Sequence, residues 1–431
     1  MASSRGRVIA ALDVGSSKVS CFIAHVGANA GPGTGGAGGL EVLGAGYRVA
    51  RGMRGGAVVN MDAVADSISG AVEDAERQAC ETVRDIYVSL SAGAPASHIV
   101  DAEVAVSGHE ISDHDLQQVL AFGRAYIEEN GPPSSEIIHA QAVSFTIDGA
   151  RGIADPRGMY GERLGVKMHI VTANSGPLHN LILSVERGHL RVAGMIAAPY
   201  ASGLACLVEG EKELGVTCID IGGGVTSVAV FEAGALIHVD VIPVGGCHVT
   251  NDIARGLSTA VDQAERIKTL RGSAIAGPND HRDLIDVPLI GEVARDQANH
   301  VSQLVLNSII QPRLEEIFEL VRGRLEAAGI SPVTARRVVL TGGGSQMQGL
   351  ADLAGRILDR PVRVGRPVGF DAVAEARNGP AFSTCAGLLR YIEGGGIEAE
   401  ARANHKIPAL ASGAGEGGSF GRFGRWLKQN F

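Results

Sequence analysis

The chain has 431 residues, of which 45% are hydrophobic and 20% are charged, values near the average for folded proteins and far from those of disordered chains. This length exceeds one compact core, so we expect two lobes with a cleft between them. The formal net charge of -9 excludes a general attraction to nucleic acid, so no nucleic-acid partner is expected and any affinity for an anionic membrane must be local.

Cysteine usage and the start of the chain bear on the compartment. The 6 cysteines form no CxxC pair and mostly lie in apolar runs, which predicts buried thiols, a reducing compartment and no structural metal. No secretory apolar region follows Met1, so we expect a cytoplasmic protein. The most apolar stretch, Val192 to Val208, is interrupted by Pro199 and Gly203 and falls short of the roughly 18 residues that a membrane span needs.

One strand-turn-strand pattern occurs twice along the chain. The turn Asp13-Val14-Gly15-Ser16-Ser17 stands between two apolar runs, and Asp220-Ile221-Gly222-Gly223-Gly224 stands between two more. Small residues at both turns tolerate unusual backbone angles, and β-branched residues follow each turn. We therefore expect two similar α/β lobes that face one another, each built on one of these hairpins.

Helices alternate with the predicted strands. Residues Asn60 to Cys80 place their apolar side chains on one helical face, with Asn60 as the N-cap. Between Ala94 and Val166 the pattern changes to three strand runs around one helix, Asp113 to Tyr126, which predicts an inserted subdomain. The strand runs are His98 to Val106, Ile137 to Ile147 and Leu164 to Val171.

A second insertion is expected over Thr250 to Pro312. Its pattern predicts a helix at Val261 to Leu270 and a polar loop around Pro278 to Asp286. The helix that carries Arg313 is expected to begin after Pro312.

Three segments near the ends of the chain differ from the rest. Ala28 to Gly39 and Gly394 to Gly418 are rich in Gly and lack apolar periodicity, which predicts flexible segments. The last one, Ser419 to Phe431, is patterned again and predicts an amphipathic helix lying in a membrane interface. Its apolar face is Phe420, Phe423, Leu427 and Phe431 with Trp426 at the edge, and its opposite face is Arg422, Arg425 and Lys428. The alternative is a helix that docks on the protein's own core.

The repeated turns have the composition of a Mg-nucleotide site. Backbone N–H groups of such a turn can face phosphate while the carboxylates of Asp13 and Asp220 hold metal-bound water. A third turn, Gly342-Gly343-Gly344-Ser345, follows the strand Arg337 to Leu340 and opens a helix, leaving room for a ring or phosphate against bare backbone. A single turn of this kind is more often just a turn, but three in this order predict a polyphosphate clamp.

Three further side chains are candidates for nucleotide contact. Lys18 follows the first turn and suits a β-phosphate, although a solvated strand lysine would read the same. Glu265 and Lys268 stand one helical turn apart and suit a ribose and a base edge, although a surface pair contributing roughly 0.3 to 0.5 kcal/mol would look identical. The predicted nucleotide-contacting residues are Asp13, Gly15, Ser16, Ser17, Lys18, Asp220, Gly222, Gly223, Gly224, Thr226, Glu265, Lys268, Gly342, Gly343, Gly344 and Ser345.

The ordered motifs resemble those of the actin, Hsp70 and hexokinase superfamily. They are Asp13-Val14-Gly15 with Lys18, Ala198-Pro199-Tyr200-Ala201 before a helix, Asp220 to Gly224, Gly342 to Gly344, and Gly379-Pro380-Ala381 before the last helix of the core. Within the superfamily the chain resembles the FtsA family. The strings that carry this resemblance are Val241-Ile242-Pro243, Val249 to Ala254, Ala264 to Lys268 and Ile309 to Glu316.

The resemblance implies a two-lobed actin-like α/β fold with an FtsA-type inserted subdomain and a C-terminal amphipathic helix. It implies binding of ATP and Mg, self-assembly into filaments, and anchoring of FtsZ filaments to the cytoplasmic face of the inner membrane at midcell. The FtsZ C-terminal tail would meet Arg313 and Glu316, which otherwise merely pair on a helix face, and the inserted subdomain would recruit later division proteins. Relatives commonly carry Thr where this chain has Val225, so weak or absent ATP hydrolysis is expected.

These expectations divide the chain into consecutive parts. They are a first-lobe core at 1–93, the inserted subdomain at 94–166, first-lobe core with a connecting helix at 167–204, a second-lobe core at 205–249, an outer subdomain at 250–312, second-lobe core at 313–370, a return helix at 371–393, a linker at 394–418 and the membrane helix at 419–431.

Three other protein classes share parts of the pattern. A sugar or acetate kinase would share the ATP motifs but has no use for a tethered amphipathic tail. An Hsp70 chaperone would need a substrate-binding domain after the ATPase core, for which residues 394–431 leave no room. The closest alternative is a type IV pilus adaptor resembling PilM, against which the tail argues.

Overall fold

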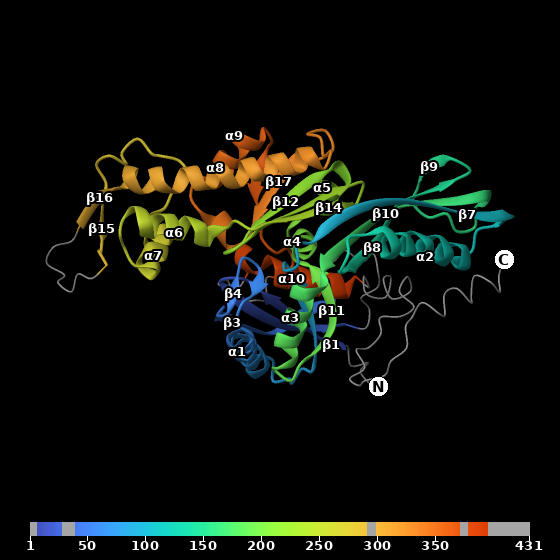
Figure 1. Ribbon diagram of the computed structural model, residues 1–431, viewed down its shortest axis with the longest axis horizontal. Helices are drawn as coiled ribbons and strands as arrows, with labels where there is room; N and C mark the ends of the chain where they lie inside the picture. The colour runs from blue at the N-terminus through green and yellow to red at the C-terminus, as the bar shows by residue number, and fades with distance from the viewer. Residues whose placement is uncertain (1–6, 28–38, 291–298, 371–377, 395–431) are drawn as a thin grey trace.

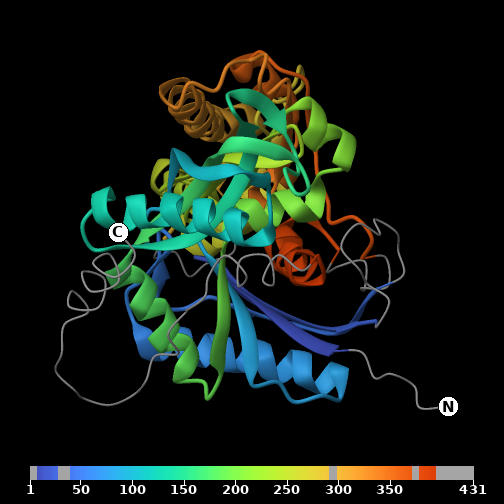
Figure 2. The same cartoon turned by 90° about the vertical axis from the view of Figure 1, so that its right-hand side faces the viewer.

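The computed structural model describes residues 7–27, 39–290, 299–370 and 378–394. The predicted membrane segment, Ser419 to Phe431, lies outside these ranges, as do the two Gly-rich segments except for Gly39 and Gly394. Figure 2 shows two lobes one above the other, with helix α10, Ser383–Glu393, between them.

The first lobe is built on a five-stranded sheet in the order β11-β6-β1-β2-β3. Its strands are β1 Arg7–Val14, β2 Lys18–Val26, β3 Leu40–Val49, β6 Asp85–Leu90 and β11 Arg191–Ala197. Side chains of β1 alternate between two cores, because Ala10 and Leu12 pack against helix α1 while Ile9 and Ala11 pack toward α10. Burial on both faces explains why this strand is apolar throughout.

Two helices cover the outer face of this sheet (Figure 1). Helix α1 spans Met61–Ala79, and α3 spans Ser175–Glu186. The side chain of Asn60 accepts a hydrogen bond from the Ala63 N–H at 3.1 Å, so the predicted N-cap is confirmed. A short hairpin, β4 Met53–Arg54 and β5 Ala57–Val58, precedes α1.

The second lobe repeats the same plan with the sheet order β14-β13-β12-β17-β18. Its strands are β12 Val216–Ile221, β13 Thr226–Glu232, β14 Ala235–Ile242, β17 Arg337–Thr341 and β18 Val362–Val364. The two predicted hairpins, β1–β2 and β12–β13, are both antiparallel. Each turn is closed by an equivalent hydrogen bond, Gly15 N to Lys18 O and Gly222 N to Val225 O, both at 3.0 Å. The internal repeat is thus confirmed in backbone geometry.

Two helices join the lobes. Helix α4, Ala198–Cys206, begins at the first residue of the Ala-Pro-Tyr-Ala motif that was expected to precede it, because Pro199 is suited to the first turn of a helix. The short helix η3, Pro380–Phe382, leads into α10. One apolar core contains Phe22 from the first lobe, Phe231 from the second, and residues of both helices. Helix α5, Glu209–Leu214, follows α4.

The outer part of the second lobe lies at the left of Figure 1. It contains α6 Gly246–Gly256, α7 Val261–Arg271, β15 Leu284–Val287, β16 Asn299–Ser302 and α8 Gln303–Ala327, and α9 Leu350–Leu358 packs on α8. The predicted helix α7 is confirmed.

Two local predictions in this region are wrong in part. The predicted polar loop is present over residues 278–283, but its last three residues belong to strand β15, because Ile285 and Val287 are buried in an alternating pattern. The helix expected to begin after Pro312 begins at Gln303 and runs through the proline. Proline removes one backbone hydrogen-bond donor from the helix. The helix nevertheless continues, because residues on both sides of the proline, such as Ile310 and Leu314, are buried on the same apolar face.

The inserted subdomain extends to the right in Figure 1 as a sheet in the order β7-β10-β8-β9 with helix α2 packed on it. Its elements are β7 Ala96–Glu110, α2 Asp113–Asn130, β8 Ser135–Ile147, β9 Ala150–Ile153 and β10 Tyr160–Asn174. The three predicted strands and the helix are confirmed. Strand β9 was not predicted because its four residues carry no apolar alternation.

The inserted subdomain also touches the second lobe. The Ser97 hydroxyl accepts a hydrogen bond from the Val239 N–H at 2.7 Å and donates to the Val239 carbonyl at 3.0 Å. Val239 lies on β14, at the edge of the second sheet, where backbone groups lack a strand partner. Buried His169 contacts the same hydroxyl through Nε2 at 2.9 Å. Ser97 of the inserted subdomain therefore forms hydrogen bonds with β14, the edge strand of the second lobe.

Candidate functional site

A cavity of about 1220 Å³ opens between the lobes. Seven of the predicted nucleotide-contacting residues line it: Ser17, Gly222, Gly223, Glu265, Lys268, Gly343 and Gly344. They come from both hairpin turns, the third glycine turn and α7. The structure therefore brings together segments that lie far apart in the sequence, in the arrangement that the three turns predict.

The two hairpin turns meet face to face. A Cβ atom placed on Gly223 would lie 2.6 Å from the Ser17 hydroxyl oxygen, and one on Gly224 would lie 2.4 Å from the Ser16 hydroxyl oxygen. Any side chain at these positions would push the lobes apart. Glycine leaves the backbone bare between the lobes, which suits close approach to phosphate.

The two aspartates lie behind these turns. Asp13 accepts a hydrogen bond from Ser89 at 2.7 Å, and Asp220 accepts from Ser202 at 2.5 Å and from Thr384 at 3.1 Å. Desolvation raises the pKa of both carboxyls, more than the hydroxyl donors and nearby Lys18 lower it. Two desolvated carboxylates next to the facing hairpin turns are a chemically suitable site for a divalent cation, whose charge would favour their ionised forms.

The third turn packs directly on Asp220. Gly342 has φ +82°, and a Cβ there would lie 2.1 Å from the Asp220 Oδ1 atom. Only glycine meets both conditions. The turn opens a short 3₁₀ helix, η1 Gly343–Gln346, rather than an α-helix, and α9 begins four residues beyond it.

Three predicted contact residues have their polar groups engaged by the protein. The Lys18 ammonium contacts the Ala381 carbonyl and lies 3.4 Å from the centre of the Phe382 ring. Desolvation lowers its pKa, against the opposing charge of Asp13. The hydroxyl of Thr226 donates to the Val244 carbonyl at 2.8 Å, and that of Ser345 donates to the Gly342 carbonyl at 2.8 Å. These two hydroxyls therefore stabilise the backbone of the turns through hydrogen bonds to carbonyl groups.

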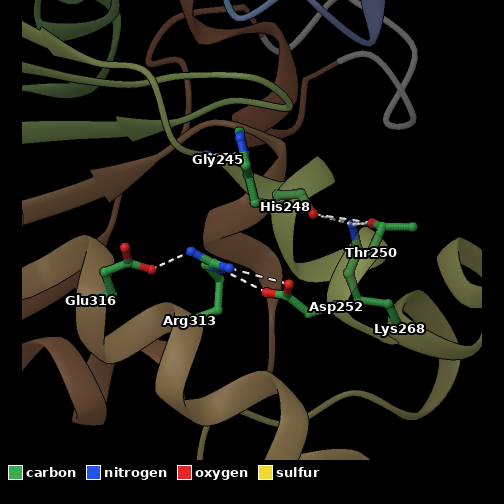
Figure 3. Close-up of polar contacts among 8 residues, drawn as sticks. Gly245, His248, Thr250, Asp252, Lys268, Arg313 and Glu316 are labelled. Atoms are coloured by element: carbon green, nitrogen blue, oxygen red, sulfur yellow. Dashed lines mark hydrogen bonds and ion pairs between the residues drawn. The ribbon is translucent and has the colours of Figure 1, made fainter. Parts of the chain in front are cut away.

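Glu265 and Lys268 form a network at the cavity wall. The Lys268 ammonium lies 2.6 Å from a Glu265 carboxylate oxygen and donates to the Thr250 hydroxyl at 2.8 Å and to the Gly246 carbonyl at 3.1 Å. Figure 3 shows Lys268 beside Thr250. The lysine side chain is 12% exposed, which separates it from an ordinary surface pair.

Helix α6 was missed as part of the site. Its first residues, Gly246 and Cys247, donate backbone N–H groups to the carbonyls of Gly222 and Gly223 at 2.9 and 2.7 Å. Thr250 on the same helix lines the cavity. The signal that could have found it is the glycine pair after a strand and before a helix, which is typical of phosphate-binding loops.

The same helix reaches the predicted partner-binding residues on α8. Arg313 binds both carboxylate oxygens of Asp252, at 2.6 and 3.1 Å, and also pairs with Glu316 (Figure 3). The hydrogen bond to Asp252 raises the pKa of the arginine. The simple i to i+3 pair considered for Arg313 and Glu316 is therefore present, and Asp252 joins it.

The site fits a nucleotide with a divalent cation. The cavity volume slightly exceeds the range of about 300 to 1,000 Å³ that is usual for small-molecule sites. Bare backbone at Gly223 and Gly343 suits phosphate, and the carboxylates of Asp13 and Asp220 suit metal-bound water. Among the residues described, no cluster of three or more His, Cys, Asp or Glu could hold a metal ion.

Solved structures with the same fold come from several functional classes. The PilM–PilN type IV pilus biogenesis complex matches with a TM-score of 0.60 and 18% identity, covering 90% of this chain and 98% of that chain. MreB5 of Spiroplasma citri matches with a TM-score of 0.53 and 13% identity, covering 92% and 98%. At these identities the likeness shows an actin-like fold and nothing further.

Sequence comparison is more specific. A family model described as cell division protein FtsA matches residues 217–387, and one described as the SHS2 domain inserted in FtsA matches residues 93–172. The cell division protein FtsA of Rhizobium meliloti is 43% identical over 433 residues, covering 100% of this chain and 96% of the relative. That of Escherichia coli K12 is 29% identical, covering 99% and 98%. The chain therefore belongs to the FtsA family of cell division proteins.

Proposed function

We propose that this protein binds ATP with Mg between its lobes and connects FtsZ filaments to the cytoplasmic face of the inner membrane. The observation that carries the nucleotide part is the convergence of both hairpin turns, the third glycine turn and helix α7 on one cavity, with Asp13 and Asp220 near the ends of the strands that lead into the hairpin turns. The structures of MreB5 of Spiroplasma citri, which share the fold, are described as bound to ADP and to AMPPNP. Asp13 and Asp220 would hold the metal-bound water, and Lys18 and Lys268 would balance phosphate charge.

Replacing Asp220 with alanine is expected to weaken ATP binding by at least about tenfold, because a desolvated anionic partner of the metal is lost. Titration of a fluorescent ATP analogue measures the effect. Asp352→Ala, an exposed aspartate on α9, is the control and should bind like the parent. Equal affinity of Asp220→Ala and the parent would remove the second turn from the site.

Slow or absent hydrolysis is part of the proposal. Val225 stands where relatives commonly carry a hydroxyl, so the second turn keeps its backbone groups but lacks one polar side chain near the phosphates. This suits a protein that uses ATP as a structural ligand and assembles into filaments, and it distinguishes the proposal from a kinase. An ATPase assay with candidate sugars separates the two classes, because a kinase would turn over rapidly.

The FtsZ C-terminal tail is proposed to bind beside Arg313 and Glu316. Arg313 is held by Asp252 on the neighbouring helix α6 and by Glu316 on its own helix, yet keeps 28% of its side chain exposed, and Glu316 keeps 48% exposed. A guanidinium already oriented in this way loses little side-chain entropy when a carboxylate of a peptide replaces one partner. The site lies one helix away from the nucleotide cavity, across α6.

Charge reversal at Arg313 is expected to lower tail-peptide affinity by at least about tenfold, since it removes the donor fork and repels acidic peptide groups. Fluorescence anisotropy with the C-terminal peptide of FtsZ from the same cell measures it. Arg322→Glu on the same helix, an exposed arginine, is the control. Unchanged affinity of Arg313→Glu in a protein folded by circular dichroism would count against this surface.

Membrane attachment is proposed to reside in Ser419 to Phe431. No helix in the described part of the chain is long and apolar enough to cross a bilayer. The proposed segment combines four apolar residues and one tryptophan with three cations and no acidic residue. Each Phe or Leu contributes at most roughly 1.5 to 3 kcal/mol, and each cation near anionic lipid contributes about 1 kcal/mol, so a single copy should bind reversibly and a filament tightly.

Deletion after Gly418, or Trp426→Glu, is expected to release the protein from anionic liposomes while ATP binding persists. The deletion removes the anchor, and the substitution places a charge at its apolar edge. Sedimentation with liposomes measures both. Should the deleted protein sediment as fully as the parent, the anchor lies elsewhere. Later division proteins are proposed to bind the inserted subdomain.

A further inference from the structure

The carboxylate of Asp220 is held by side chains from two other elements. Ser202 on α4 donates to its Oδ2 atom at 2.5 Å, and Thr384 on α10 donates to the same atom at 3.1 Å. The two hydroxyl oxygens lie 2.9 Å apart. Ser202 is fully buried, and Thr384 and Asp220 are less than 10% exposed. A strand of the second lobe therefore meets both interlobe helices at one oxygen atom.

The hydroxyl pair fixes which way the carboxylate faces. An ionised carboxylate only accepts, so each hydroxyl directs its single hydrogen to Oδ2. The other oxygen, Oδ1, then faces the glycine turn, where a Cβ on Gly342 would lie 2.1 Å from it. The oxygen on the turn side is left for the metal-bound water that the proposed function places there.

The two helices touch at the same place. A Cβ on Gly387 of α10 would lie 1.7 Å from the Ala201 carbonyl of α4. This backbone contact is next to Ser202 in α4 and within one helical turn of Thr384 in α10. Any shear of one lobe against the other that moves α4 along α10 must therefore change the distances from the two hydroxyls to Asp220.

We infer that Ser202 and Thr384 are positioning residues that hold the Asp220 carboxylate in the orientation needed for the metal. Because Ser202 and Thr384 lie at the crossing of α4 and α10, this orientation depends on how the two lobes are arranged. The inference rests on the proposed binding of ATP with Mg. The new element is that two hydroxyls at the helix crossing, which do not line the cavity, determine how much Mg increases the affinity for the nucleotide.

A neighbouring hydroxyl supplies a matched control. Ser383 precedes Thr384 in α10 and is equally buried, but its Oγ lies 2.7 Å from the Thr341 hydroxyl and 3.1 Å from the Cys206 sulfur. It belongs to the same crossing and makes no hydrogen bond to Asp220. Removing it should disturb helix packing to a similar degree without freeing the carboxylate.

The test uses the full chain and four variants: Ser202→Ala, Thr384→Val, Thr384→Ser and Ser383→Ala. Affinity for a fluorescent ATP analogue is measured with Mg and with EDTA, and the melting temperature is measured without nucleotide. The gain in affinity that Mg gives the parent is expected to fall by about tenfold in Ser202→Ala and Thr384→Val, because a hydrogen bond to a charged group is lost. Affinity in EDTA should change by less than about twofold. Thr384→Ser and Ser383→Ala should keep the Mg gain.

The outcomes separate this inference from the function beneath it. A parent that gains no affinity from Mg overturns the metal site and the inference together. A parent that gains affinity from Mg, with Thr384→Val and Ser202→Ala gaining as much, overturns the inference alone. An equal loss in Ser383→Ala also overturns it, because the cause would then be helix packing, and the melting temperatures would fall in parallel.

Discussion

Replacing Gly387 with alanine is expected to destabilise the protein by about 3 kcal/mol, near the upper end of what overpacking costs. The added methyl group would lie 1.7 Å from the Ala201 carbonyl oxygen, and that oxygen belongs to backbone inside helix α4. Relief requires one helix to move away from the other. Both helices contribute to the core shared by the two lobes, so the shift would loosen contacts in both. The urea midpoint of unfolding measures the effect.

Gly323→Ala supplies the control for this experiment. Gly323 lies in helix α8, and a Cβ there would meet nothing within 4 Å. Alanine is a better helix former than glycine, so this variant should match the parent or gain up to about 1 kcal/mol. If Gly387→Ala unfolds at the same urea midpoint as the parent, the crossing of α4 and α10 has room to adjust. The argument that movement of α4 along α10 must change the contacts to Asp220 would then fail.

Much of the fold could be predicted because its signals are local. Each hairpin is marked by an Asp and small residues between apolar strands, and the equivalent bonds at Gly15 and Gly222 confirm the repeat. The N-cap at Asn60 is likewise encoded within a few residues. Periodicity was less reliable where an element is short or crosses a breaker, as at β15 and Pro312.

The parts of the site that escaped prediction depend on distant partners. Ser202 and Thr384 contact Asp220 from 18 and 164 residues away in the sequence, each on a separate helix, and nothing beside either residue marks it as polar support for a carboxylate. In the sequence, Gly387 is only a poor helix former inside a predicted helix. The structure shows that it is needed because the Ala201 backbone packs directly against it. Three turns predicted the cavity, whereas the groups that orient its carboxylates required the tertiary structure.

Ser97 is a further example, and it introduces a pH-dependent element. Its hydroxyl hydrogen goes to the Val239 carbonyl, so its contact with His169 requires the histidine to donate from Nε2. The His169 Nδ1 atom is then the unprotonated nitrogen, buried and without a hydrogen-bond partner among the residues that the structure describes. A proton added there would place an unpaired N–H and a charge in the contact between the inserted subdomain and the second lobe.

Acidification is therefore expected to destabilise the protein through His169. Desolvation, with smaller contributions from the neighbouring histidines His238, His139 and His98, lowers the pKa of His169 to about 3. In the unfolded chain its pKa is near 6.5. As the pH falls through this window the unfolded state binds the proton first, so stability that is complete above pH 6.5 is lost toward pH 3, at up to about 1.4 kcal/mol per pH unit.

The His169 contribution is isolated by comparing pH profiles of unfolding between about pH 7 and pH 4.5, within the window that the two pKa values define. His169→Gln keeps an N–H donor for Ser97 but takes up no proton, so its stability should fall less steeply than that of the parent. His238 and His98, whose pKa values are also lowered by desolvation, contribute equally to both proteins and cancel. His114→Gln, which replaces an exposed histidine on α2, is the control. Parallel profiles for His169→Gln and the parent would show that His169 takes up its proton in the folded protein, and that the contact of Ser97 with Val239 survives the added charge.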